Sequence, residues 1–160
     1  LIGASSPAER DAVLRPFAER GLEERVLFTD FTPLETMLRH VRRADICLAP
    51  YPADNRMLAT ATPTKLVEYL AMGRRIVANL HPDHCVAAQS APALVTLCAF
   101  SEDAFAEALE QSAATPEPDI QAQADATQWV RDQRSYDRLS DLVRAVYART
   151  ITPRRARATT

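Results

Sequence analysis

The sequence predicts an α/β domain in which helices cover a mainly parallel sheet. Short apolar runs rich in β-branched residues alternate with longer stretches whose apolar residues recur at helical spacing, which is typical of strand and helix units on a parallel sheet. The composition agrees, because 47% of the 160 residues are hydrophobic and 25% are charged, as in one globular domain with its own core. No apolar run approaches the roughly 18 to 20 residues that a membrane-spanning helix needs.

The first elements are predicted from capping and turn residues. We expect a strand at residues 1–4 and then a helix from about Pro7 to Arg20. Ser6 followed by Pro7 is a typical helix start, and Gly21 is a typical stop. The apolar residues of this helix, which we expect to face the sheet, are Val13, Leu14 and Phe17.

The next elements follow the same alternation. Strands are expected at 25–29 and 45–49, and between them Thr32 and Pro33 open a second helix. Residues 50–62 then form a connection longer than the usual strand-to-helix turn, and such loops at the carboxyl ends of parallel strands often bind ligands.

The second half of the chain contains three further helices and two strands by the same reasoning. A helix at 63–72 stops at Gly73, strands follow at 75–80 and 95–100, and a helix capped by Ser101 comes next. Pro116 and Pro118 break the chain, and a final helix is expected to continue to about Arg149.

Several functional classes are disfavoured by composition. With only three glycines the chain holds neither a G-x-G-x-x-G fingerprint nor a P-loop. A net charge of -2 argues against nucleic acid as a partner, because phosphate neutralisation dominates that affinity. The three cysteines lack C-x-x-C spacing, which favours reduced thiols and a cytoplasmic location.

The start of the helix at 63–72 is the clearest candidate binding site. Thr62 is a natural N-cap and Pro63 a natural first residue, so the amides of Thr64, Lys65 and Leu66 would point out of the helix. Free amides and the helix dipole together form an anion site that needs no glycine.

Two charged side chains extend this site. Lys65, the only lysine of the chain, would add a positive charge beside the amides, and Glu68 would accept hydrogen bonds from a diol such as ribose. Leu66, Val67, Leu70 and Ala71 would form the apolar face of the helix. The plainer interpretation is a helix opener followed by an exposed ion pair worth about 0.3 kcal/mol.

A second candidate is the polar run from His81 to His84. It follows the carboxyl end of a predicted strand and offers metal ligands, but Asp83 is equally a helix cap. Three ligands within four loop residues are poor spacing for zinc, so we expect no metal here.

The motifs around the helix start resemble those of a known family. They read RVLFTD at 25–30, ADICLAPY at 44–51 and TPTKLVEYLAMGRRIVA at 62–78, with Gln128 and Trp129 near the end. They are similar to the C-terminal domain of GT-B glycosyltransferases of the retaining group 1 family, also called family 4. Asp30, Thr60 and Arg75 depart from the family pattern, and Thr60 stands where a first glutamate is usual.

The resemblance implies a Rossmann-like three-layer α/β/α fold, the C-terminal half of a GT-B enzyme. Residues 1–150 would be the nucleotide-sugar-binding domain, and 151–160 a disordered basic tail. Because the chain begins at Leu1 and not at Met, we expect it to be part of a longer protein. The residues expected to bind the donor are Tyr51, Thr62, Thr64, Lys65, Leu66 and Glu68.

The implied activity is hexosyl transfer from a nucleotide-diphosphate sugar in glycan or polysaccharide synthesis, without a metal or cofactor. Lys65 would stabilise the departing diphosphate, and an N-terminal domain absent from this chain would hold the acceptor, leaving the chain inactive by itself. Any membrane contact would be peripheral, at the inner face. Two rival interpretations stay open: a nonenzymatic, partner-binding GT-B-like domain, and a GT-B-shaped nucleotide-sugar epimerase.

Overall fold

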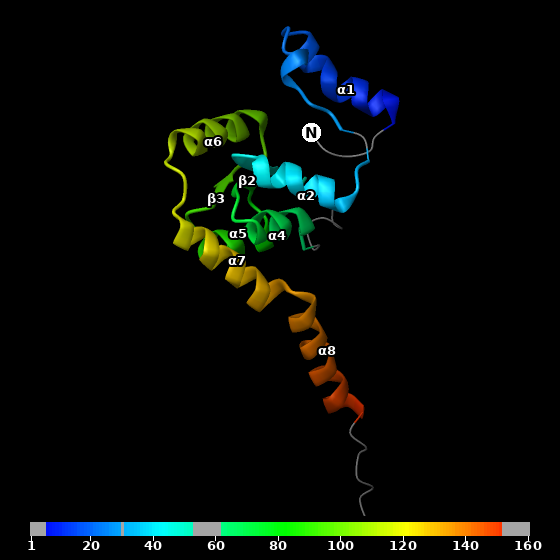
Figure 1. Cartoon of the computed structure of the whole chain (residues 1–160), viewed down its shortest axis with the longest axis vertical. Helices are drawn as coiled ribbons and strands as arrows, with labels where there is room; N and C mark the ends of the chain where they lie inside the picture. The colour runs from blue at the N-terminus through cyan, green and yellow to red at the C-terminus, as the bar shows by residue number, and fades with distance from the viewer. Residues whose placement is uncertain (1–5, 30, 53–61, 152–160) are drawn as a thin grey trace, which may run out of the picture. The chain divides into compact units, whose positions relative to one another are not determined.

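The computed structural model describes residues 6–29, 31–52 and 62–151 (Figure 1). Contacts divide the chain into two compact units, Leu1–Arg43 and Ala44–Thr160. The predicted strand at 1–4, the middle of the loop at 50–62 and nearly all of the tail at 151–160 lie outside the described residues. Within the described ranges, we find no helix with the length and apolar character required to cross a membrane.

Residues 6–29 and 31–43, the described part of the N-terminal unit, contain three helical elements. They are α1 (Pro7–Ala18), the 3-10 turn η1 (Glu23–Arg25) and α2 (Leu34–Arg43). The predicted start of α1 is confirmed, since the Ser6 hydroxyl accepts the Glu9 N–H at 3.3 Å and the Glu9 carboxylate accepts the Ser6 N–H at 2.8 Å. The predicted stop is also confirmed, because Gly21 has φ +63°.

Two predictions for this unit are wrong. Helix α1 buries none of its residues, and Val13 and Phe17 are 41% and 36% exposed, so its apolar side is not buried as expected. The predicted strand at 25–29 is replaced by η1 and by extended chain with a single bridge residue, Thr29. A strand forms only where a neighbour supplies a ladder of hydrogen bonds, and periodicity alone cannot provide that neighbour.

The C-terminal unit is built on a three-stranded parallel sheet, which confirms the predicted fold class. Its strands are β1 (Ile46–Ala49), β2 (Arg75–Asn79) and β3 (Val95–Cys98), in that spatial order. Ala49 pairs with Ala78, and Asn79 pairs with Cys98, so the three strands end at one edge. This carboxyl edge is where the sequence led us to expect a ligand.

Helices cover both faces of this sheet (Figure 1). On one side lie α4 (Thr64–Ala71), α5 (Pro82–Ser90) and α7 (Ile120–Arg134), and on the other lies α6 (Glu102–Ala114). Fully buried Ile76 and Ala78 face the first group, while buried Val77 alternates to the side of α6. The core cluster comprises Ala49, Leu66, Leu70, Ile76, Ala78, Ala87, Ala91, Leu94, Val95, Ala126 and Val130.

The C-terminal helix differs from the prediction. It is interrupted at Ser135, which has an extended ψ of 154° and separates α7 from α8 (Tyr136–Ile151). The Ser135 hydroxyl accepts the N–H of Arg138 at 3.2 Å and so caps α8. The interruption turns the chain at Tyr136, which becomes important for the site described next.

Candidate functional site

The candidate site begins at the first turn of α4, one residue later than predicted. Pro63, not Thr62, is the N-cap, and no side chain caps the helix. Proline has no N–H and its φ of −68° suits this position equally well, so the pattern Thr-Pro did not fix the cap. The Thr62 hydroxyl therefore does not cap the helix.

The predicted anion-binding amides are retained despite this shift. Val67 donates the first backbone hydrogen bond of the helix, to the Pro63 carbonyl at 3.4 Å. Among the described residues, no hydrogen bond is found for the amides of Thr64, Lys65 and Leu66. These three amide N–H groups point out of the start of the helix, where the helix dipole favours an anion.

The faces of α4 agree only partly with the prediction. Leu66 and Leu70 are 2% and 0% exposed and enter the core, as expected. Ala71 is exposed, so assigning it to the apolar face was wrong. It lies five residues beyond Leu66, about 140° further around the helix, which turns it away from the sheet. Lys65 is exposed and Glu68 is half-buried.

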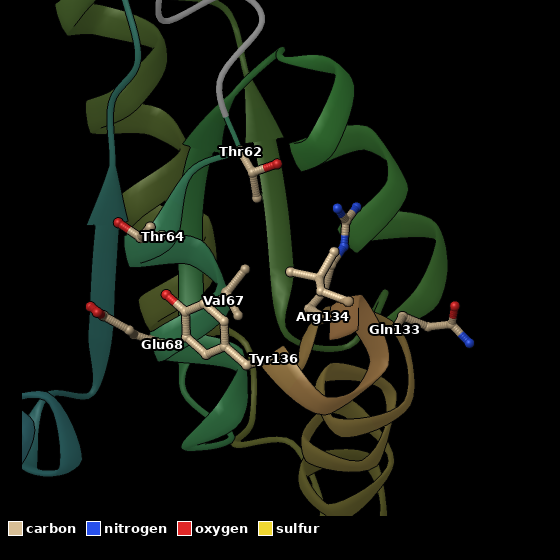
Figure 2. Close-up of a pocket in the computed structure, with 8 residues that line it drawn as sticks. Thr62, Thr64, Val67, Glu68, Gln133, Arg134 and Tyr136 are labelled. Carbon is tan, nitrogen blue, oxygen red and sulfur yellow. The ribbon is translucent and has the colours of Figure 1, made fainter. Parts of the chain in front are cut away.

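A pocket of about 360 Å³ opens beside this helix start (Figure 2). The lining residues come from two segments far apart in sequence, and they are Thr62, Thr64, Val67, Glu68, Gln133, Arg134, Tyr136 and Leu139. The structure thus brings together three of the predicted donor-binding residues, Thr62, Thr64 and Glu68. The other three, Tyr51, Lys65 and Leu66, do not line this pocket.

The second wall of the pocket, at the junction of α7 and α8, was not predicted. The Arg134 guanidinium reaches α5, where it donates to the Asp83 carboxylate at 3.2 Å, and it lies 5.5 Å from the centre of the Trp129 ring. In Figure 2 the phenol group of Tyr136 points toward the wall formed by α4. The signal in the sequence was Ser135, a capping residue inside what otherwise reads as one helix.

Tyr51 lies next to this region and is held by the end of β2. The Tyr51 N–H donates to Asn79 Oδ1 at 2.7 Å, and Asn79 Nδ2 donates to the Tyr51 carbonyl at 2.9 Å. Asn79, 1% exposed, therefore extends the pairing of β1 and β2 with its side chain. Burial raises the pKa of Tyr51, and the Glu68 carboxylate raises it further, which indicates that the two residues are close.

The run from His81 to His84 has a structural role. His81 is the N-cap of α5, a helix that was not predicted, and its Nδ1 accepts the Asp83 N–H at 3.2 Å. His84, fully buried, donates from Nδ1 to the Asn79 carbonyl at 2.7 Å. Within residues 6–29, 31–52 and 62–151, no three His, Cys, Asp or Glu side chains are arranged to hold a metal ion.

Comparison with known proteins gives a family and a fold. The family model "Glycosyl transferases group 1" matches residues 1–114. No curated protein matches the sequence.

Two solved structures have the same fold. The chain is similar to sucrose-phosphate synthase from Thermosynechococcus elongatus, with 19% identity and a TM-score of 0.69, over 93% of this chain and 38% of that one. It is also similar to WaaG, a glycosyltransferase involved in lipopolysaccharide biosynthesis, with 16% identity and a TM-score of 0.63, over 91% of this chain and 36% of that one. The chain thus spans less than two fifths of either protein.

Proposed function

Because the chain belongs to the group 1 glycosyltransferases, we propose that it is the donor-binding half of an enzyme that transfers a sugar from a nucleotide-diphosphate sugar to an acceptor. The observation that carries the proposal is the start of α4, where three amides with no hydrogen-bond partner among the described residues and the Glu68 carboxylate lie within two turns of one helix. Amides at a helix start suit phosphate oxygens, and a carboxylate suits the hydroxyl groups of ribose.

In this proposal the diphosphate lies at the amides of Thr64, Lys65 and Leu66. Leaving-group charge develops there during transfer, and donors already aimed at that charge lower the barrier without a metal. Lys65 is exposed beside these amides and adds its positive charge. Tyr51, held by Asn79 at the carboxyl edge of the sheet and close to Glu68, flanks the ribose of the donor.

The type of reaction and its cellular context are proposed from the family. We propose a retaining transfer of a hexose in glycan or polysaccharide synthesis in the cytoplasm, with peripheral membrane contact only and with an acceptor held outside this chain. The lipopolysaccharide role of WaaG supports this context.

The proposal is tested by nucleotide binding to the variant Glu68→Ala. Losing the two hydrogen bonds that the ribose hydroxyl groups would donate to this carboxylate should weaken UDP or GDP binding by at least tenfold, measured by calorimetry. Glu107→Ala is the matched control, because Glu107 is an exposed carboxylate on α6 and does not line the pocket. Unchanged affinity in Glu68→Ala would refute the donor site.

A further inference from the structure

We propose that α8 docks on an anionic lipid surface, with an apolar strip of the helix among the headgroups and its arginines on the lipid phosphates. The apolar strip comprises Leu142, Val143, Val146 and Tyr147. This inference rests on the peripheral membrane contact in the proposed function and deepens it by naming the surface that makes the contact. Helix α8 lies beyond residues 1–114, the part of the chain that the family model matches.

The apolar strip is exposed. Its four side chains are between 47% and 61% exposed, and every residue of α8 from Tyr136 to Thr150 is exposed as well. The four positions are i, i+1, i+4 and i+5, so they share one side of the helix. A contiguous apolar side on an exposed helix is typical of an interaction surface.

The charged residues of α8 are arranged around the strip as they are in helices that lie at a membrane interface. Arg138, Arg144 and Arg149 lie about 90° to 130° from the middle of the strip, on both of its flanks. Asp137 and Asp141 lie about 150° to 170° away, on the opposite side of the helix. With the strip among the headgroups, the arginines reach the lipid phosphates and the carboxylates face water.

The charge that follows Asp141 in the sequence has one sign. Residues 142–160 contain five arginines and no Asp or Glu, although the chain as a whole carries a net charge of -2. About four to eight cations on or beside an amphipathic helix are typical of segments that bind anionic lipids. Two copies of the chain docked through α8 would bring like charges together, so the charge favours a lipid surface over a dimer.

The length of α8 places it in the plane of the surface. Its 16 residues span about 24 Å, less than the roughly 30 Å of a bilayer core. No helix in the described part of the chain could cross a membrane. Tyr147 suits the interface because its ring is apolar and its hydroxyl group is polar. Tyr136 and Leu139 of the same helix line the pocket, so docking brings the proposed donor site close to the lipid.

Vesicle binding tests the inference. We would measure by co-sedimentation how the chain binds vesicles of phosphatidylcholine alone and vesicles of phosphatidylcholine mixed with phosphatidylglycerol, at low and at high salt. Two double variants separate the apolar contribution from the electrostatic one: Val143→Ser with Val146→Ser, and Arg144→Gln with Arg149→Gln. Ile120→Ser and Arg131→Gln are the matched controls, because they change an exposed apolar and an exposed basic residue of α7.

The expected result is binding that needs both the strip and the arginines. The chain should bind the mixed vesicles at least tenfold more tightly than phosphatidylcholine alone, and high salt should weaken this binding. Each double variant should weaken it at least fivefold, and only the arginine variant should also reduce its dependence on salt. The two controls should stay within twofold. UDP affinity should stay within twofold in both double variants, because none of the four residues lines the pocket.

Three results would overturn the inference. If the chain binds mixed vesicles no better than phosphatidylcholine alone, α8 does not dock on anionic lipid. If the strip variant abolishes self-association in sedimentation velocity but leaves vesicle binding unchanged, the strip is a contact between two copies. If the chain binds vesicles but the longer protein that we expect does not, the rest of that protein covers the strip.

UDP binding distinguishes failure of this inference from failure of the donor site. A chain that binds UDP but no vesicles keeps the proposed donor site and overturns the membrane surface. A chain that binds vesicles through the strip but binds no UDP refutes the donor site and supports the membrane surface.

Discussion

At the scale of single residues, Asn79 shows how the carboxyl edge of the sheet is held together. Its side-chain amide offers an acceptor and a donor, and Tyr51 uses both through its backbone at 2.7 Å and 2.9 Å. Pro50, the residue between β1 and Tyr51, has no N–H, so the ordinary ladder cannot continue through it. Asn79 thus fixes the first residues of the loop that leads to α4.

Replacing Asn79 should therefore destabilise the C-terminal unit. We expect Asn79→Ala to lower the free energy of unfolding by about 2 to 4 kcal/mol, because it leaves two backbone groups of Tyr51 without partners. Asn79→Asp keeps the acceptor and loses the donor, so its effect should be intermediate. Urea unfolding followed by circular dichroism measures both, and equal stability of all three proteins would contradict this role.

His84 makes the stability of the protein depend on pH. Burial is the main cause that lowers its pKa below the usual 6.5, although the hydrogen bond to the Asn79 carbonyl opposes this. The unfolded chain therefore takes up the proton more readily than the folded one. The stabilising effect is complete above about pH 6.5 and is lost as the pH falls below it.

Urea unfolding between pH 8 and pH 5 tests this dependence. The free energy of unfolding should decrease below about pH 6.5, and the variant His84→Gln should show a flatter profile whatever its absolute stability. If the free energy of unfolding of His84→Gln falls with pH as steeply as that of the unsubstituted protein, another group causes the pH dependence.

The chemical role of a residue could be predicted from the sequence better than the residues that surround it in the fold. The pattern from Thr62 to Glu68 correctly indicated unpaired amides and an outward carboxylate. It could not show that Lys65 would stay outside the pocket while Glu68 entered it, because that depends on the position of α8. Asn79 and Tyr136 were missed as site residues for the same reason: their partners are distant in sequence.

At the scale of elements, the end of α4 shows how one glycine fixes the packing of two helices. Gly73 has φ +62°, and the N–H of Arg74 donates to the Tyr69 carbonyl at 3.0 Å, as in a Schellman motif. A Cβ added at Gly73 would lie 2.9 Å from Cβ of Gln123 on α7. The close approach of α4 and α7 at this point therefore requires glycine.

The variant Gly73→Ala should be clearly destabilised. Strain at positive φ costs about 1 kcal/mol and the contact with α7 adds to it, so we expect a loss of about 2 to 3 kcal/mol in unfolding experiments. Gly21→Ala is a matched control, because Gly21 has nearly the same φ, +63°, but no atom within 4 Å of the added Cβ. If both variants lose the same amount, the contact with Gln123 contributes nothing.

The elements found from the sequence are those with strong local signals. The strands found at 46–49, 75–79 and 95–98 lie within those predicted at 45–49, 75–80 and 95–100, and the helix after Ser101 was predicted from its cap. Helix α5 was not placed among the predicted elements, because its cap is His81, an uncommon cap, and not Asp83, which the sequence offered as one. The division at Ser135 was missed because the apolar spacing continues across it.

At the scale of the whole molecule, the core belongs to one unit. Every member of the core cluster lies within Ala44–Thr160, and so does every residue that lines the pocket. A fragment of residues 44–160 should therefore unfold cooperatively in urea and keep the nucleotide affinity of the whole chain within threefold. A fragment without a cooperative transition would show that residues 1–43 are required for folding.

The two walls of the pocket differ in how freely they can change over generations. One wall is part of α4, a helix whose buried residues belong to the core. The other wall combines Gln133 and Arg134 of α7 with Tyr136 and Leu139 of α8, a helix that buries none of its described residues. Substitutions at Tyr136 or Leu139 therefore meet few packing constraints. Selection can therefore alter the α8 side of the pocket and leave the first turn of α4 intact, so members that diverged from this chain would differ first at Tyr136 and Leu139.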